Sequence, residues 1–138
     1  NEKGINDFLN IAKAMPNKKF IVTSSSNKEC NIDLPSNVSY INNLTKRQYY
    51  SYLSKAKYYL STAYQETFGY TLREAMLYDC RIVAPNELCY PEMLPEECLY
   101  NRKDLDTIKK YLTTEFQMPR GYKGMYDESF NNMINLLV

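Results

Sequence analysis

The sequence predicts an α/β fold, a Rossmann-like doubly wound domain built on a parallel β-sheet. Short apolar segments rich in β-branched and aromatic residues alternate with amphipathic segments of helical period, which is the pattern of successive strand–helix units. The strand segments are continuous apolar runs, as expected of strands buried on both faces of a parallel sheet. Since the chain has 138 residues, the usual size of one domain, we expect residues 1–138 to form a single domain with about five strands.

The first half of the chain alternates between helix and strand as this fold requires. Apolar residues recur at helical spacing in INDFLNIAKAM until Pro16 ends the run. The segments KKFIVTSSS and NVSYIN carry β-branched and aromatic residues typical of strands, and Thr45 stands where it can cap the helix that follows. In chain order, we predict a helix at 5–15, strands at 18–26 and 37–42, a helix at 46–56 and a strand at 57–62.

The second half continues the alternation. RIVAPN and CLYN are predicted as strands, and Asp104 stands near the start of a helical segment that follows them. In chain order, we predict a helix at 67–79, a strand at 81–86, a short helix at 87–94, a brief strand at 98–101, a helix at 104–116 and a last helix at 127–138.

The start of the chain departs from the usual order of a doubly wound domain. Such domains normally begin with a strand, whereas this sequence begins with a loop and a helix. Either the first strand is missing or the chain is a fragment of a longer protein, and both explanations stay open. Because ligands bind at the carboxyl ends of the strands, the loops that could hold a site are 23–36, 42–45, 62–68 and 86–92.

Composition gives no positive sign of several function classes, although a basic patch could still lie within the nearly neutral total. The chain has 17 basic and 16 acidic residues, so no charge excess indicates a nucleic-acid surface or a solvating tail. It has no histidine, and none of its four cysteines forms a C-x-x-C pair, so we expect no metal site. No apolar run approaches the ~20 residues of a membrane span and no signal peptide is visible, so we expect a cytoplasmic protein.

The segment QETFGYTLREAM, residues 65–76, is the strongest candidate for a ligand site. It leads from a predicted strand into a helix, whose first N–H groups and positive dipole end attract anions. Gly69 would let a ligand approach the backbone closely. Glu66 and Glu74 stand ~12 Å apart along a helix, too far for a glycosidase pair but suited to the two ends of one polyhydroxylated ligand.

A structural interpretation of the same residues stays open. Thr71 and Glu74 match a capping box, in which the two side chains satisfy backbone amides at the start of a helix. A glutamate on a helix is also usually solvated. On this interpretation neither carboxylate touches a ligand.

The motif ETFGYTLREAM, followed by DCRIVAPN and PEML, resembles the nucleotide-sugar-binding domain of GT-B glycosyltransferases, and most closely that of family 4, also called group 1. That family carries E-x-F-G-x-x-x-x-E-A-M, a form of the E-x7-E motif, then a strand and a loop that ends in a glutamate. The resemblance covers about residues 2–115 and implies one half of a GT-B architecture. The matching residues are Glu66, Phe68, Gly69, Glu74, Ala75, Met76, Val83, Ala84 and Glu92.

The resemblance implies a role for each candidate site residue. Glu66 would be the catalytic residue that contacts the hydroxyls of the transferred sugar, and Glu74 would hold the ribose hydroxyls. Lys3 would face the diphosphate and offset its charge as the glycosidic bond breaks. The donor-binding residues that the resemblance implies are Lys3, Thr67, Phe68, Gly69, Glu74 and Glu92.

The resemblance also implies a reaction and partners. The nucleotide-sugar donor is a substrate, no cofactor or metal is expected, and members with this motif are usually retaining enzymes. The acceptor is unknown and would be bound mainly by an N-terminal domain that this chain lacks. We therefore expect the chain alone to be an inactive donor-binding half, and a peripheral membrane contact through the absent half stays open.

Two other functions stay open as well. One is a different enzyme of the same fold, such as a nucleotide-sugar epimerase, and the other is a non-enzymatic, degenerate Rossmann-like binding module. Departures from the family pattern motivate the second. The loop after strand 81–86 is ELCYPE instead of glycine-rich, so Leu88, Cys89 and Tyr90 would crowd a donor, and Asn43 stands near where a glycine is usual.

Overall fold

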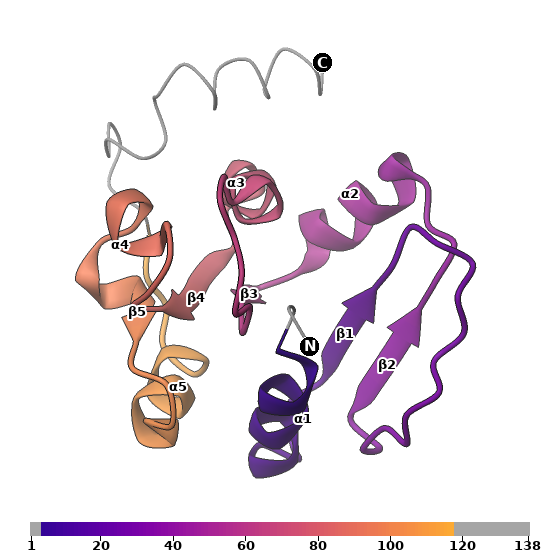
Figure 1. The fold of residues 1–138 in the computed structure, drawn as a ribbon, viewed down its shortest axis with the longest axis horizontal. Helices are drawn as coiled ribbons and strands as arrows, with labels where there is room; N and C mark the ends of the chain where they lie inside the picture. The colour runs from indigo at the N-terminus through magenta and orange to yellow at the C-terminus, as the bar shows by residue number, and fades with distance from the viewer. Residues whose placement is uncertain (1–3, 118–138) are drawn as a thin grey trace.

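The computed structural model describes residues 4–117 and has the predicted mixed α/β fold with parallel strands (Figure 1). Every element predicted within this range is present, although most are shorter than their sequence patterns. The predicted helix at 127–138 lies outside the described residues. In chain order the elements are α1 (Ile5–Ala14), β1 (Phe20–Thr23), β2 (Val38–Ile41), α2 (Lys46–Lys55), β3 (Tyr58–Leu60), α3 (Tyr70–Leu77), β4 (Arg81–Pro85), α4 (Tyr90–Met93), the 3-10 turn η1 (Glu96–Cys98), β5 (Leu99–Tyr100) and α5 (Leu105–Tyr111).

The strands form two parallel sheets, whereas the sequence pattern suggested one. β1 pairs with β2, with Phe20 opposite Val38. β4 pairs with β3 on one side, with Tyr58 opposite Arg81, and with β5 on the other. Each pair is parallel because a crossover returns the chain to the same end of the sheet before the next strand begins. Within residues 4–117 no backbone pairing joins β1 to β3.

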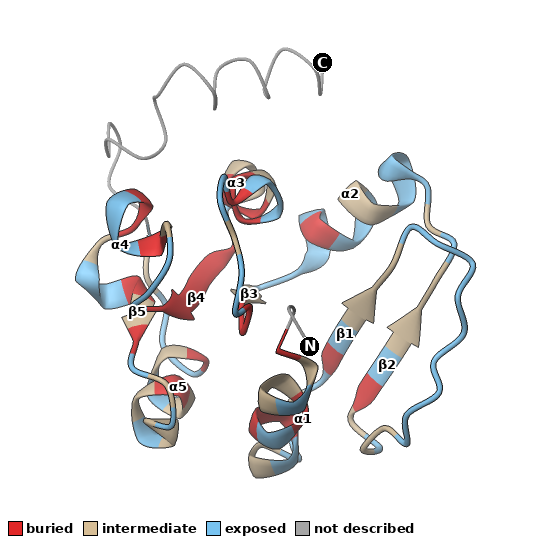
Figure 2. Ribbon diagram, in the orientation of Figure 1, coloured by how far each residue is buried: buried red, intermediate tan, exposed pale blue. Residues whose placement is uncertain are grey.

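Helices cover both faces of the strands, which gives the layered arrangement of an α/β domain. α2 and α3 lie on one face and α1 and α5 on the other (Figure 1). β4 is buried at every position and separates two cores (Figure 2). Ile82 and Ala84 pack with α2, α3 and α4, whereas Val83 packs with α1 and α5. The continuous apolar run of this strand is thus explained by burial on both sides.

Two helix starts are capped by side chains. As predicted, Thr45 caps α2: its hydroxyl accepts from the amide of Gln48 at 3.2 Å, and the Gln48 side chain accepts from the Thr45 amide at 2.9 Å. Asp104 caps α5 by accepting from the amide of Thr107 at 3.2 Å and from its hydroxyl at 2.7 Å. These bonds satisfy amides that the first helical turn leaves without partners.

Candidate functional site

A hydrogen bond between Gly69 and Glu66 organises the corner between β3 and α3. The amide nitrogen of Gly69 donates to Oε1 of Glu66 at 3.0 Å. Gly69 is the capping residue of α3, so the carboxylate takes one of the amides at the positive end of this helix. Glu66 is half-buried. Its second oxygen, Oε2, takes no part in this bond and can accept from a hydroxyl group of a ligand.

Gly69 is required at this corner by both backbone and packing. Its φ of 64° lies in the left-handed region, which disfavours residues with a side chain. A Cβ atom at this position would lie 2.9 Å from Cε and 3.0 Å from Sδ of Met93, and 3.8 Å from Sγ of Cys89. On that side, the space that we expected a ligand to use is therefore filled by α4.

Phe68 and Tyr70 form a stacked and exposed aromatic pair on either side of Gly69. Their ring centroids lie 5.4 Å apart with an interplanar angle of 29°. Phe68 is 56% exposed and Tyr70 is 50% exposed, which is unusual for large aromatic residues. Nε of Arg73 donates to the carbonyl of Phe68 at 3.1 Å and so fixes the backbone below the ring. The pair offers a flat apolar surface beside Glu66.

Glu74 is half-buried on α3 and faces Tyr50 of α2. Burial, and then the hydrogen bond between the Tyr50 hydroxyl and this carboxylate, raise the pKa of Tyr50 to about 12. The Tyr50 ring in turn stacks on Tyr78, with centroids 5.8 Å apart. Glu74 is thus held by a neighbouring helix instead of being freely solvated.

The capping-box interpretation of Glu74 is wrong. Gly69, not Thr71, caps α3, and the Thr71 hydroxyl is hydrogen-bonded to the hydroxyl of Tyr59 at 2.8 Å. Burial is the main cause of the raised pKa of Tyr59, and the charges of Glu66 and Glu74 both add to it. The two carboxylates therefore lie within electrostatic reach of one hydroxyl.

The remaining predicted site residues are Thr67, Glu92 and Lys3. Thr67 is exposed on the loop, and Glu92 is exposed on α4. Burial and then the charge of Glu66 raise the pKa of the Cys89 thiol, with a smaller contribution from Glu92. Glu66 and Glu92 thus both lie near Cys89. Lys3 lies outside the described residues.

The start of α1 contacts the end of β3 through Gly4. The hydroxyl of Thr62 donates to the carbonyl of Gly4 at 2.9 Å. Gly4 has a φ of 66°, and a Cβ atom there would lie 1.9 Å from the carbonyl oxygen of Thr62. Only glycine allows this approach, so Gly4 fixes the start of α1 against the end of β3, a role that sequence analysis missed.

Arg102, which sequence analysis also missed, joins three loops at the carboxyl end of the strands. Its Nη1 donates to the carbonyl of Thr62 at 3.2 Å, and its Nη2 donates to the carbonyl of Ala63. Its Nε donates to Glu87 at 2.8 Å, and its guanidinium lies 3.8 Å from the centroid of the Tyr64 ring. A single arginine outside any motif gives no sequence signal for this role.

Tyr90, one of the three loop residues expected to crowd a donor, is buried in the core. It is only 2% exposed, and its hydroxyl is hydrogen-bonded to that of Ser61 at 2.7 Å. The hydroxyl of Tyr100 donates to the Ser61 carbonyl at 2.7 Å. Leu88 is 42% exposed with a φ of 61°, and Asn43 has a φ of 58°. Leu88 and Asn43 therefore both have the left-handed backbone conformation that is typical of glycine, although neither residue is a glycine.

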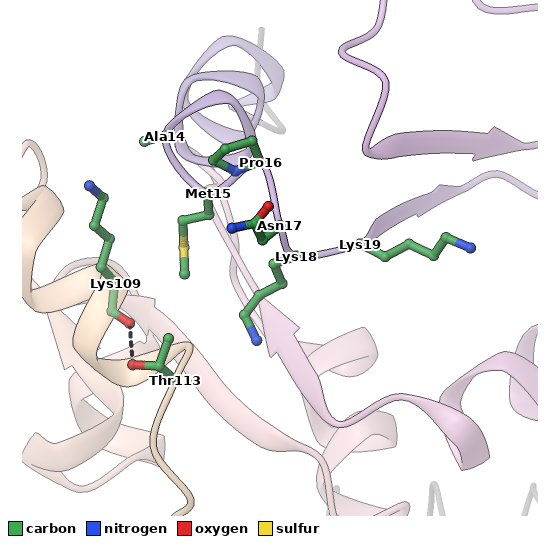
Figure 3. Close-up of a pocket in the computed structure, with 8 residues that line it drawn as sticks. All are labelled: Ala14, Met15, Pro16, Asn17, Lys18, Lys19, Lys109 and Thr113. Carbon is green, nitrogen blue, oxygen red and sulfur yellow. Dashed lines mark hydrogen bonds between the residues drawn. The ribbon is translucent and has the colours of Figure 1, made fainter.

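An open hollow of about 610 Å³ lies at the opposite end of the strands. Figure 3 shows Met15 and Lys18 extending from the turn after α1 toward α5, whereas Lys19 points away. Burial, and then the charge of Lys57, lower the pKa of Lys18. Ligands of doubly wound domains bind at the carboxyl ends of the strands, so this hollow is not the predicted site. Its lining residues are Ala14, Met15, Pro16, Asn17, Lys18, Lys19, Lys109 and Thr113.

The described part of the chain was also searched for metal sites and for membrane-spanning helices. Within residues 4–117, no group of three or more metal-ligating side chains could hold a metal ion. No helix in the same range has the length and apolar character needed to cross a membrane.

Comparison with known proteins finds a relative that matches part of the chain. No protein-family profile matches the sequence. The chain is 37% identical over 89 residues to the tRNA-queuosine alpha-mannosyltransferase of Drosophila melanogaster. The matched region is 64% of this chain but only 23% of the relative, so the similarity concerns less than a quarter of that protein.

Proposed function

We propose that this chain is the donor-binding half of a retaining GT-B glycosyltransferase of family 4. The observation that supports this proposal is the corner between β3 and α3, where the half-buried Glu66 accepts from the Gly69 amide and Glu74 lies on α3 itself. The similarity to a mannosyltransferase supports glycosyl transfer in general. The substrate would be a nucleotide-diphosphate sugar.

In this proposal the two carboxylates bind opposite ends of the donor. Oε1 of Glu66 is held by Gly69, so Oε2 accepts from a hydroxyl of the transferred sugar. Glu74 accepts from Tyr50 and retains acceptor capacity for the ribose hydroxyls. Thr67, Phe68 and Glu92 would line the same donor site. This assignment is supported by the positions of these residues: Thr67 and Phe68 follow Glu66 on the loop, and Glu92 lies on α4, which contributes Cys89 near Glu66.

The reaction would move a sugar from the diphosphate to an acceptor hydroxyl. The bond between the sugar and the diphosphate oxygen breaks, a bond to the acceptor oxygen forms, and the acceptor loses its hydroxyl proton. Negative charge develops on the leaving diphosphate, so positive groups that face it lower the barrier. The amides at the start of α3 supply part of this field, and Lys3 would add a full charge. We propose no metal or other cofactor.

The acceptor would be bound mainly by an N-terminal domain, so the chain alone would be inactive. The relative acts on queuosine in tRNA by its name, which makes a nucleoside of RNA the first acceptor to test. The exposed ring of Tyr70, which stacks on Phe68, favours such an acceptor, because unpaired bases stack on aromatic side chains. Nucleotide-mannose would be the first donor to test, again from the relative's name.

The test is transfer by the natural full-length protein. It should be incubated with radiolabelled nucleotide-mannose and total tRNA, and the label in the RNA should be measured. We expect transfer by the wild type and a loss of at least 100-fold in Glu66→Gln, which keeps the bond to Gly69 but removes the charge. Glu97→Gln is a matched control, because Glu97 is exposed on η1 outside the proposed site.

Other outcomes would contradict the proposal in distinct ways. Release of an epimerised nucleotide sugar, with no acceptor labelled, would indicate an epimerase. Failure to bind any nucleoside diphosphate at millimolar concentration would indicate a non-enzymatic binding module.

A further inference from the structure

Every charged residue that lines the hollow at the amino ends of the strands is a lysine. Lys18 and Lys19 lie between α1 and β1, and Lys109 lies on α5, so two segments far apart in the sequence form this lysine hollow (Figure 3). Among the described residues that line it, none is acidic. The nearly neutral total charge of the chain therefore conceals a local basic surface.

The charges of the lysine hollow have no counter-ion. Within residues 4–117, the ammonium groups of Lys18, Lys19 and Lys109 form no ion pair and no hydrogen bond. Nζ of Lys18 lies 4.4 Å from the centroid of the Tyr58 ring. This contact holds the ammonium group in place but does not neutralise it. The three charges can therefore all bind an anion.

Lys57 adds a further positive charge beside the hollow. Burial, and then the charge of Lys57, lower the pKa of Lys18, so the two ammonium groups repel each other. Lys57 lies 4.0 Å from Glu115, but the two side chains are 72% and 87% exposed, and so exposed a pair contributes little. An anion bound in the hollow would relieve the repulsion between Lys18 and Lys57.

Lysines near the end of a helix can stabilise the helix itself, because its last carbonyl groups carry partial negative charge. At the end of α1 a neutral side chain binds these groups instead. Nδ2 of Asn37 donates to the carbonyl of Ala12 at 2.9 Å and to that of Met15 at 3.0 Å. The carbonyl of Lys18 lies 2.9 Å from the same nitrogen. The Lys18 ammonium group is therefore not needed to cap α1.

The end of α5 is capped in the same way. The hydroxyl of Thr113 donates to the carbonyl of Lys109 at 2.9 Å (Figure 3). The hydroxyl of Thr114 donates to the carbonyl of Lys110 at 2.9 Å. These neutral groups satisfy carbonyls that the last helical turn leaves without partners. The Lys109 ammonium group thus also remains free for a ligand.

The hollow suits phosphates spaced along a chain better than one compact anion. Compact phosphate sites use backbone amides at the start of a helix, whereas α1 and α5 both end here. The positive charge therefore comes only from long lysine side chains on separate elements. Such lysines contact successive phosphates of a nucleic-acid backbone without reading its sequence.

A lipid surface fits the hollow less well. Basic surfaces that bind membranes also insert apolar side chains. None of the large apolar residues that are exposed within residues 4–117 lines the hollow, namely Ile21, Ile32, Tyr52, Tyr64, Phe68, Tyr70 and Leu88. A flat lipid surface would also not enter a concave space of about 610 Å³.

We propose that the lysine hollow binds the phosphate backbone of the acceptor RNA, at the end of the domain opposite the candidate donor site. The choice of RNA rests on the proposed function, whereas the phosphate contacts rest on the lysines. The hollow would hold the body of the RNA while its acceptor nucleoside reaches the carboxyl ends of the strands. Loss of the lysines should therefore raise the KM for RNA and leave kcat unchanged.

RNA binding by the natural full-length protein, without a sugar donor, tests this inference. The anisotropy of fluorescein-labelled total tRNA gives the Kd over a series of salt concentrations. The double variant Lys18→Gln/Lys109→Gln should raise the Kd at least 10-fold. It should also lower the slope of log Kd against log salt by about 1–2, because each lost phosphate contact removes ~0.7–0.9. Lys18→Arg/Lys109→Arg keeps both charges and should bind like the wild type.

Lys46→Gln/Lys55→Gln is the matched control, because it removes the same charge from exposed positions of α2, on the other face of the strands (Figure 1). Equal Kd values for the glutamine variant of the hollow and this control would overturn the inference, as would a wild type that binds no RNA. Phosphatidylserine vesicles supply the other arm. If the hollow variant loses vesicle binding but keeps RNA binding, the hollow binds lipid and the inference is wrong.

Transfer assays on the same variants separate this inference from the proposed function. If the protein binds RNA through the hollow but transfers no mannose, the proposed function fails alone. If it transfers mannose to RNA with the same KM in the hollow variant as in the control, the inference fails alone.

Discussion

Nε of Arg102 donates a hydrogen bond of 2.8 Å to Oε2 of Glu87, which joins the loop after β5 to the loop after β4. The same guanidinium binds the carbonyls of Thr62 and Ala63 and is only 15% exposed. Three loops at the carboxyl end of the strands thus depend on one side chain. Its planar, forked geometry suits several acceptors at once, which lysine cannot match.

We predict that Arg102→Lys destabilises the fold by about 1–3 kcal/mol, because two buried carbonyl groups lose their donors. Urea denaturation followed by circular dichroism measures this. Arg47→Lys is a suitable control, since Arg47 is exposed on α2. Equal midpoints for both variants would show that Arg102 does not hold the loops.

The Glu66 side chain should act as a cap for α3 as well as a ligand-binding group. Glu66→Ala removes the acceptor of the Gly69 amide and should cost about 0.5–2 kcal/mol, as loss of a capping side chain does. Glu66→Gln keeps an acceptor oxygen and should remain near wild-type stability. Denaturation of the two variants side by side is the measurement, and equal losses in both would contradict this role.

Gly69→Ala should be destabilising for two separable reasons. The left-handed backbone costs about 1–2 kcal/mol for a residue with a side chain, and the new Cβ clashes with Met93. A double variant with Met93→Ala should therefore lose less than the sum of the two single variants. Strict additivity in thermal denaturation would contradict the contact between these residues.

Asp104 should make the stability of α5 depend on acid pH. Hydrogen bonds from the Thr107 side chain and backbone lower the pKa of Asp104. A carboxylate whose pKa is lowered by folding stabilises the protein above its unfolded pKa of ~3.9, and this stabilisation is lost as the pH falls further. Asp104→Asn can still cap the helix but cannot titrate. Its unfolding free energy should thus fall less than that of the wild type between pH 5 and pH 2 in urea titrations.

Much of the fold could be predicted from sequence because local patterns carry it. The apolar run around Val83 predicted a buried strand, and Thr45 predicted a helix start, since both signals lie within a few residues. The separation of the strands into two sheets could not be predicted, because pairing between distant segments leaves no local pattern. Element lengths were also overestimated, since the loop before α3 extends through Gly69.

The candidate site was predicted only in part. Glu66 and Gly69 were identified as a unit, but the role of Gly69 in packing against Met93 depends on a contact between distant segments. The same holds for Tyr90, whose burial against Ser61 leaves no pattern in the loop sequence. Long-range partners, rather than residue types, decide these roles.

The central claim is that Glu66 and Glu74 bind opposite ends of one nucleotide sugar. Calorimetric titration of the natural protein with a nucleoside diphosphate, and then with its mannose ester, tests this most directly. Glu74→Gln should weaken both ligands by about 1–3 kcal/mol, whereas Glu66→Gln should weaken only the sugar-bearing ligand. If Glu74→Gln binds the nucleoside diphosphate as tightly as the wild type, the claim is wrong.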